Sequence, residues 1–157
     1  MAAQLMGKKA PAFRVQDDTD TTVTLASLKG EWVVLFFYPK DMTSGCTVEA
    51  CEFRDALPRF TKMKAKIFGV SPDSVTSHQK FKAKEGLTYP LLSDPEHTML
   101  EAYGVWVEKS MYGRKYMGVE RTTVIIDPAG TVAQVFTKVK PAGHAEEVTA
   151  WLRAHAG

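Results

Sequence analysis

Asparagine is absent from this chain of 157 residues, and cysteine occurs only twice. Without asparagine the chain offers no acceptor for N-linked glycosylation and lacks the asparagine of a cysteine-protease triad. No segment approaches the roughly 18 uninterrupted apolar residues of a membrane span, and the first residues lack the apolar core of a signal peptide. We therefore expect a cytoplasmic protein without a membrane partner, and a targeting peptide removed before residue 1 would leave no trace here.

The chain also lacks strong charge, internal repeats and Pro/Gly/Ser linkers. Its net charge is +2, and its basic residues are scattered rather than gathered in a stripe with aromatics, which argues against a nucleic-acid partner. With 45% hydrophobic and 24% charged residues it has the composition of a soluble globular protein. We expect a single domain over residues 1–157 and, because no long exposed apolar segment stands out, a monomer.

Two apolar runs predict buried strands. "WVVLFFY" (32–38) has no polar alternation, which is typical of a strand covered on both faces of a parallel sheet, and "KIFGVS" (66–71) is similar. Between them, apolar residues at helical intervals predict a helix that begins near Ser44 or Gly45. Proline removes a helical hydrogen bond, so Pro58 is expected to end or kink this helix.

The remaining segments continue this alternation of strands and helices. They are predicted as an N-terminal β-hairpin over residues 13–25 with a helical turn ending at Gly30, a helix over 74–86, a strand over 89–94, a hairpin with arms at 122–127 and 131–136, and an amphipathic helix over 143–157. The predicted fold class is therefore α/β, with a central mixed β-sheet flanked by helices.

The two cysteines, Cys46 and Cys51, could be a zinc half-site, a structural disulfide, core packing or a redox couple. A zinc site would need C-x2-C spacing and further ligands, and the four histidines show no such spacing. Those histidines are expected at the surface or at helix caps: His78, His97, His144 and His155. Cys46 is predicted in the first turn of its helix, where unpaired N–H groups and the helix dipole favour a thiolate.

The helix end alone is too weak to activate a thiol. Bringing a thiol pKa from about 8.5 to about 6 takes roughly 3.4 kcal/mol, whereas a helix end supplies at most about 2 kcal/mol. A nearby cation is therefore needed. Arg54 would lie roughly 12 Å from Cys46 along the helix, which is too far. Lys40 and Arg121 both stay open as candidates on physical grounds.

The residues around Cys46 resemble those of a known family. Pro39, Thr43 and Cys46 form the spacing P-x3-T-x2-C, which is similar to the active-site signature of the peroxiredoxins. "FYPKD..SGCTVEAC.FRD" resembles their bacterioferritin comigratory protein/peroxiredoxin Q branch, and "GVSPDS", "YPLLSD", "YGVW" and "RTTVIID" extend the likeness over nearly the whole chain. In that branch the resolving cysteine stands where Cys51 does, and the family pattern selects Arg121 as the active-site cation.

The resemblance implies a thioredoxin-like fold and a thiol-dependent peroxidase of antioxidant defence, with no metal and no organic cofactor. It implies that Cys46 is the peroxidatic cysteine, that Thr43 and Arg121 orient the peroxide, and that Pro39 shields the sulfur. Glu49 is either an orienting partner of Arg121 or an acid favoured at a helix start. The expected reductant is thioredoxin, or a glutaredoxin-like dithiol. A thioredoxin-type carrier is the rival enzyme, and a chaperone or peroxide sensor is a second role.

Geometry adds one expectation about Cys46 and Cys51. Residues five apart on a regular helix have Cα atoms roughly 8.7 Å apart, whereas a disulfide needs about 4.4 to 6.8 Å. An intramolecular disulfide between them therefore requires the helix to unwind, and we expect residues near 44–54 to be locally unfolded in the oxidised form.

Overall fold

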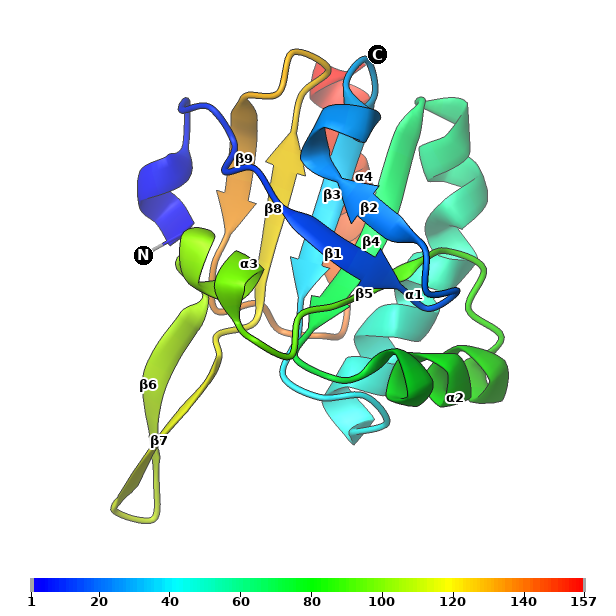
Figure 1. Cartoon of the computed structure of the whole chain (residues 1–157). Coiled ribbons are helices and arrows are strands. Elements are labelled where there is room, and N and C mark those ends of the chain that lie inside the picture. Colours follow the sequence, from blue (N-terminus) through cyan, green and yellow to red (C-terminus); the bar gives the residue numbers. More distant parts are fainter. Residues whose placement is uncertain (1, 157) are drawn as a thin grey trace.

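The computed structural model describes residues 2–156, which form a mixed seven-stranded sheet with the strand order β2-β1-β5-β4-β3-β8-β9 (Figure 1). Strands β3, β4 and β5 are parallel, and β8 runs antiparallel to β3. The strands are β1 (Arg14–Asp17), β2 (Thr22–Thr24), β3 (Trp32–Phe37), β4 (Ala65–Ser71), β5 (Leu91–Ser93), β8 (Thr122–Ile126) and β9 (Val132–Phe136). The predicted α/β class and mixed sheet are confirmed, and so is the N-terminal hairpin of β1 and β2.

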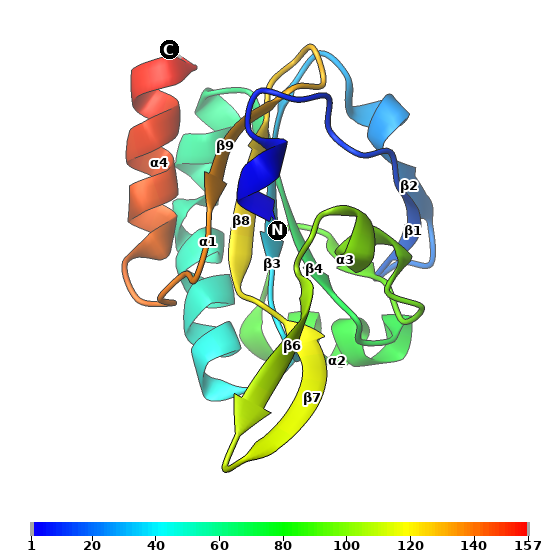
Figure 2. The ribbon, with the colours of Figure 1, turned by 90° about the vertical axis from the view of Figure 1, so that its left-hand side faces the viewer.

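Helices lie on both sides of the sheet. Helix α1 (Ser44–Lys62) and helix α4 (His144–His155) lie side by side on one face, and the short helix α3 (Thr98–Ala102) lies on the other (Figure 2). The other helical segments are α2 (Val75–Glu85) and two 3-10 turns, η1 (Ala2–Leu5) and η2 (Leu25–Leu28). None of the helices in residues 2–156 is both long enough and apolar enough to cross a bilayer.

Strand β3 is the centre of both hydrophobic cores. Its residues from Val33 to Phe37 are at most 1% exposed. Val34 and Phe36 join the core beneath α1 and α4, while Val33, Leu35 and Phe37 join the core on the other face. Because successive side chains of a strand point to opposite faces, two covered faces require the unbroken apolar run seen in the sequence.

Helix α1 begins at Ser44, as predicted, and extends to Lys62. Pro58 was expected to end or kink this helix, and the first alternative is wrong, because the helix passes through this residue. Proline has no N–H to donate to the carbonyl four residues earlier, so the carbonyl of Arg54 lacks its usual helical partner. The helix is held instead by the burial of Phe53, Ala56 and Phe60, which flank the defect.

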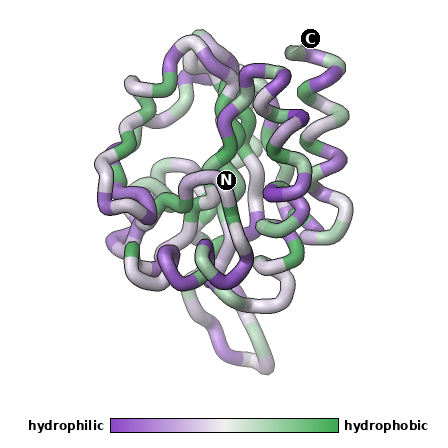
Figure 3. The backbone as a smooth tube through the Cα atoms, turned by 90° about the vertical axis from the view of Figure 1, so that its right-hand side faces the viewer, coloured by the Kyte–Doolittle hydropathy of each residue, from purple (hydrophilic) through white to green (hydrophobic). Residues whose placement is uncertain are grey.

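Helix α4 has the predicted amphipathic character. Ala145, Val148 and Leu152 are buried while Glu146 and Arg153 are exposed. Figure 3 shows hydrophilic and hydrophobic residues alternating along this C-terminal helix. Residue 157, the last of the predicted helix, lies outside the described residues.

A two-stranded ribbon, β6 (Trp106–Met111) and β7 (Arg114–Val119), was not predicted. It projects beyond the main sheet in Figure 2, and its turn places Tyr112 and Gly113 at positive φ. Both strands are largely exposed, so the buried-strand pattern that revealed β3 is missing. Large exposed side chains gather here, namely Met111, Tyr112, Tyr116 and Met117.

Candidate active site

Three of the predicted site residues, Cys46, Glu49 and Arg121, meet near the carboxyl end of β3, where the chain passes through Pro39 into α1. Strand β8 runs antiparallel to β3, with Thr122 opposite Phe37. The residue before β8, Arg121, is therefore delivered to the same end of the sheet as the start of α1. Ends of α/β strands are common positions for functional sites.

Cys46 is buried, with a relative exposure of 1%, and Arg121 Nη2 donates a hydrogen bond to its Sγ at 3.1 Å. Of the two candidate cations, Arg121 is the one that contacts the sulfur. Lys40 is exposed, and among residues 2–156 its ammonium makes no ion pair. A guanidinium suits this position because it keeps its charge when partly buried and offers several N–H donors.

Glu49 holds this arginine from the second turn of α1. Arg121 Nη1 donates to Glu49 Oε1 at 2.7 Å, and the carboxyl group is fully buried. Burial raises the pKa of Glu49 from 4.5 to about 7, although the positive charge of Arg121 opposes that rise. Among the described residues its Oε2 has no hydrogen-bond partner. Its burial and its bond to Arg121 favour the reading of Glu49 as an orienting partner of this arginine over that of an acid placed by the helix dipole.

Thr43 is the residue that precedes α1, and its side chain does not cap the helix. Its hydroxyl donates to the carbonyl oxygen of Lys40 at 2.9 Å, which leaves the hydroxyl lone pairs available to accept a proton donor. The first N–H groups of α1 also have no carbonyl partner within the helix. Met42, directly before Thr43, has a φ of 65°, so this loop holds a backbone conformation that is uncommon for a residue with a side chain.

Cys51 lies a turn further along α1 and is half-buried. Its Sγ lies 3.6 Å from Glu85 Oε1 and 3.6 Å from Arg54 Nη1. Burial raises the pKa of the Cys51 thiol; the Arg54 charge opposes this shift, and the Glu85 carboxylate adds to it. Both cysteines are free, and α1 is continuous between them. The structure therefore has the reduced, folded arrangement.

A buried polar network behind the loop was missed by the sequence analysis. The Asp41 carboxylate accepts from Tyr38 Oη at 2.6 Å and from Ser77 Oγ at 2.8 Å, and it bonds His78 Nδ1 at 2.7 Å. The Asp41 N–H donates to Asp73 at 2.8 Å. This network ties the loop before α1 to α2. Buried polar partners follow no sequence periodicity, so no pattern reveals them.

Two of the four histidine predictions are wrong. His78 is fully buried in this network, and His144 is 2% exposed against Thr123 at the start of α4. His97 precedes α3 as its cap residue, and His155 is exposed, as expected. Asp41, Asp73 and His78 lie close enough to hold a metal ion. However, His78 Nε2 must donate its proton to the Leu92 carbonyl at 2.9 Å, and Nδ1 already bonds Asp41. Asp41, Asp73 and His78 therefore already use these polar atoms in hydrogen bonds within the protein.

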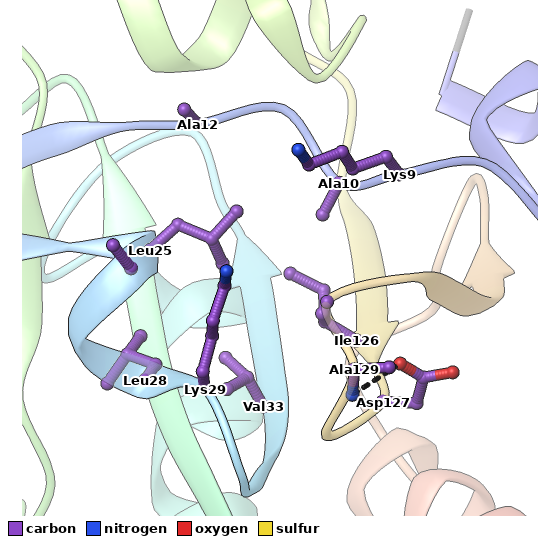
Figure 4. Close-up of a pocket in the computed structure, with 12 residues that line it drawn as sticks. Lys9, Ala10, Ala12, Leu25, Leu28, Lys29, Val33, Ile126, Asp127 and Ala129 are labelled. Atoms are coloured by element: carbon purple, nitrogen blue, oxygen red, sulfur yellow. Dashed lines mark hydrogen bonds between the residues drawn. The ribbon is translucent and has the colours of Figure 1, made fainter.

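A separate cavity of about 500 Å³ lies at the opposite end of β3 from Cys46, beside Val33 and Ile126 (Figure 4). The residues that line it are mostly aliphatic and include Lys9 and Lys29. The carboxylate of Asp127 accepts a hydrogen bond from the Ala129 N–H at 3.0 Å. Neither of the two cysteines lines this cavity, and no other predicted site residue does.

Comparisons with known proteins show the family of this chain. The AhpC/TSA family model matches residues 6–135. The chain is 48% identical to a putative peroxiredoxin Bcp of Coxiella burnetii, with 94% of this chain and 97% of the relative covered. It is 47% identical to peroxiredoxin Bcp of Bacillus subtilis, with 94% of each chain covered.

Solved structures of relatives are also similar to this chain in fold. A cysteine-to-serine mutant of Xylella fastidiosa PrxQ superposes with a TM-score of 0.92 at 40% identity, covering 97% of each chain. The bacterioferritin comigratory protein of Xanthomonas campestris, described in terms of its alkyl peroxide reduction activity, superposes with a TM-score of 0.89 at 46% identity, covering 92% of each chain.

Proposed function

The chain belongs to the AhpC/TSA family and is a peroxiredoxin of the Bcp/peroxiredoxin Q group, and from this premise we propose that Cys46 is its peroxidatic cysteine and Cys51 its resolving cysteine. The observation that supports this assignment best is the hydrogen bond of 3.1 Å from Arg121 Nη2 to the buried Cys46 Sγ. A cation and a helix start that converge on one sulfur favour its thiolate, the reactive form.

In the first step the Cys46 thiolate attacks one oxygen of the hydroperoxide. The O–O bond breaks, the sulfur is oxidised to a sulfenic acid, and the other oxygen leaves as water or an alcohol after taking a proton. Arg121 and the first N–H groups of α1 stabilise the charge on the leaving oxygen, and Thr43 accepts a hydrogen bond from the peroxide. Glu49 orients Arg121, and Pro39 shields the sulfur from bulk water.

In the second step the Cys51 thiol condenses with the sulfenic acid. An S–S bond forms, and the sulfenic oxygen leaves as water with the thiol proton. An external dithiol then reduces the disulfide by exchange. We propose thioredoxin, or a glutaredoxin-like dithiol, as this reductant, acting on a monomer in the cytoplasm.

The substrates proposed are hydrogen peroxide and organic hydroperoxides. Support for the organic class comes from the Xanthomonas campestris relative, whose structures concern alkyl peroxide reduction. Exposed apolar side chains close to Cys46 in the sequence, Met42 and Val48, are also suited to an alkyl group.

A peroxidase assay coupled to NADPH through thioredoxin and its reductase tests the roles of the two cysteines. Cys46→Ser should abolish turnover. Cys51→Ser should consume one equivalent of peroxide rapidly and then stop at a sulfenic acid, which mass spectrometry would detect. If Cys46→Ser still reacted rapidly while Cys51→Ser did not, the assignment of the two cysteines would be reversed. Single-turnover reaction without any recycling by dithiols would favour a peroxide sensor.

A further inference from the structure

The thiol of Cys51 is held by the end of α2 and not by the residues around Cys46. Its Sγ lies 3.6 Å from the carboxylate of Glu85, the last residue of α2. Cys46 Sγ instead bonds Arg121, the residue directly before β8. In the folded state the two thiols are thus attached to different parts of the molecule.

Arg54 strengthens the attachment of Cys51. Its Nη1 donates to the main-chain carbonyl oxygen of Glu85 at 2.6 Å and also lies 3.6 Å from Cys51 Sγ. The last carbonyls of a helix have no partner within the helix and favour a positive charge. Arg54 therefore bridges the resolving thiol and the C-terminal end of α2.

A third contact comes from Tyr89, shortly after α2. Its hydroxyl donates to the Ala50 carbonyl oxygen at 2.7 Å, and both residues are buried. Ala50 directly precedes Cys51 in α1. Residues 85–89 consequently hold three positions of α1, namely Ala50, Cys51 and Arg54.

Disulfide formation requires the Cα atoms of the two cysteines to approach from roughly 8.7 Å to within about 6.8 Å, and contacts that hold Cys51 in the intact helix oppose this movement. We propose that Arg54, Glu85 and Tyr89 form a latch that positions the resolving cysteine: it keeps α1 folded around Cys46, and its opening limits the rate of disulfide formation. The kinetic part of this inference rests on the proposed function.

The latch affects the competition between two fates of the Cys46 sulfenic acid. In one, Cys51 attacks the sulfur, an S–S bond forms, and water leaves. In the other, a second hydroperoxide oxidises the sulfenic acid to a sulfinic acid and is itself reduced to water or an alcohol. A tighter latch slows the first reaction and so increases the share of the second.

Hydrogen exchange on the reduced protein tests the latch without requiring peroxide turnover. Arg54→Met and Tyr89→Phe should each increase exchange in residues 44–54. The control is Arg59→Met on the same helix, whose guanidinium pairs with Glu146 of α4 at 2.8 Å, away from α2. Tyr89→Phe keeps the buried ring and removes one hydroxyl. Protection equal to that of the unmodified protein in both latch variants would overturn the proposal.

Disulfide formation after one equivalent of hydrogen peroxide gives the second measurement. Both latch variants should form the disulfide roughly 3- to 10-fold faster, as expected for the loss of one hydrogen bond, and should accumulate less sulfinic acid when peroxide is raised. Slower disulfide formation in Arg54→Met would contradict the latch, since it would mean that the guanidinium activates the Cys51 thiolate. Because the exchange experiment does not depend on catalysis, failure of the latch is distinguishable from failure of the proposed function.

Discussion

Arg121 makes two different contacts through one guanidinium. Nη2 bonds the Cys46 sulfur at 3.1 Å, and Nη1 bonds the Glu49 carboxylate at 2.7 Å. The planar fork lets a single side chain stabilise the thiolate while being fixed by a buried acid. A lysine could not reproduce both contacts with the same geometry.

Replacement of this arginine should therefore reduce the reaction of Cys46 with peroxide. We expect Arg121→Met to slow it by roughly 100-fold or more, because a positioned donor is removed from the developing charge. Lys40→Met is the matched control and should have little effect, since Lys40 is exposed. Stopped-flow measurement of the second-order rate constant compares the two variants. Equal losses in both would show that Arg121 is not the activating cation.

Glu49 makes a pH dependence of stability testable. Its pKa rises from 4.5 to about 7 on folding, so between these values the native state binds more protons than the unfolded state. The contribution of Glu49 to the free energy of unfolding must then fall as the pH rises from about 4.5 to about 7. Glu49→Gln keeps an oxygen for Arg121 and removes the titration. Denaturant unfolding under reducing conditions should show the variant gaining stability relative to the unmodified protein from pH 5 to pH 8. A difference that stayed constant with pH would refute this.

At the scale of single elements, helix α1 carries Cys46 in its first turn and lacks one main-chain hydrogen bond further along, at Pro58. Pro58 leaves the Arg54 carbonyl without a helical donor, so the hydrogen-bond ladder is interrupted at the end of the segment that must unwind. Beyond it, the buried Phe60 fixes the rest of the helix to the core. Local unfolding of the first turns is therefore possible without loss of the whole helix.

We expect oxidation to release residues 44–54 and leave the end of α1 protected. Hydrogen exchange on the reduced protein and on the intramolecular disulfide form compares the two states directly. Residues 59–62 and helix α4 serve as internal references, because they lie outside the segment expected to unwind. Unchanged protection from hydrogen exchange over residues 44–54, in a sample shown by mass spectrometry to contain the disulfide, would contradict this prediction.

At the scale of the whole molecule, the Asp41 network connects parts that are distant in the sequence. It joins the end of β3, the loop after β4, helix α2 and β5 through bonds of Asp41, Asp73 and His78. These contacts hold the loop that carries Pro39 and Thr43. A buried network of this kind is stabilising only while all of its members are paired.

Asp41→Asn should consequently destabilise the protein by about 3 kcal/mol, because an amide replaces one of the two acceptor oxygens with a donor, which must face either the Tyr38 hydroxyl or Ser77 and His78. The control is Asp20→Asn in the exposed β1–β2 turn, where φ is 62° and asparagine is well tolerated. Guanidinium unfolding of the reduced proteins measures both changes. A loss of less than about 0.5 kcal/mol in Asp41→Asn would mean that the network contributes little to stability.

The sequence by itself determined the elements whose pattern is local. The apolar run of β3 had to be a buried strand, and the residues after Pro39 had to begin a helix near Ser44, because burial and helix periodicity act over a few neighbouring residues. The position of Cys46 in the first turn of that helix followed from the same pattern. The exposed ribbon of β6 and β7 escaped prediction because it buries too little to leave such a pattern.

Only the tertiary structure shows Arg121 in contact with Cys46, as the family resemblance implied, and shows what surrounds the loop. Arg121 lies 75 positions from Cys46 in the chain and reaches it because β8 pairs antiparallel with β3. His78 pairs with Asp41 across 37 positions, against the expectation of an exposed or capping residue. Charge and hydrogen bonding act through space, so a sequence contains these groups without showing which of them will meet until strand pairing and helix packing bring them together.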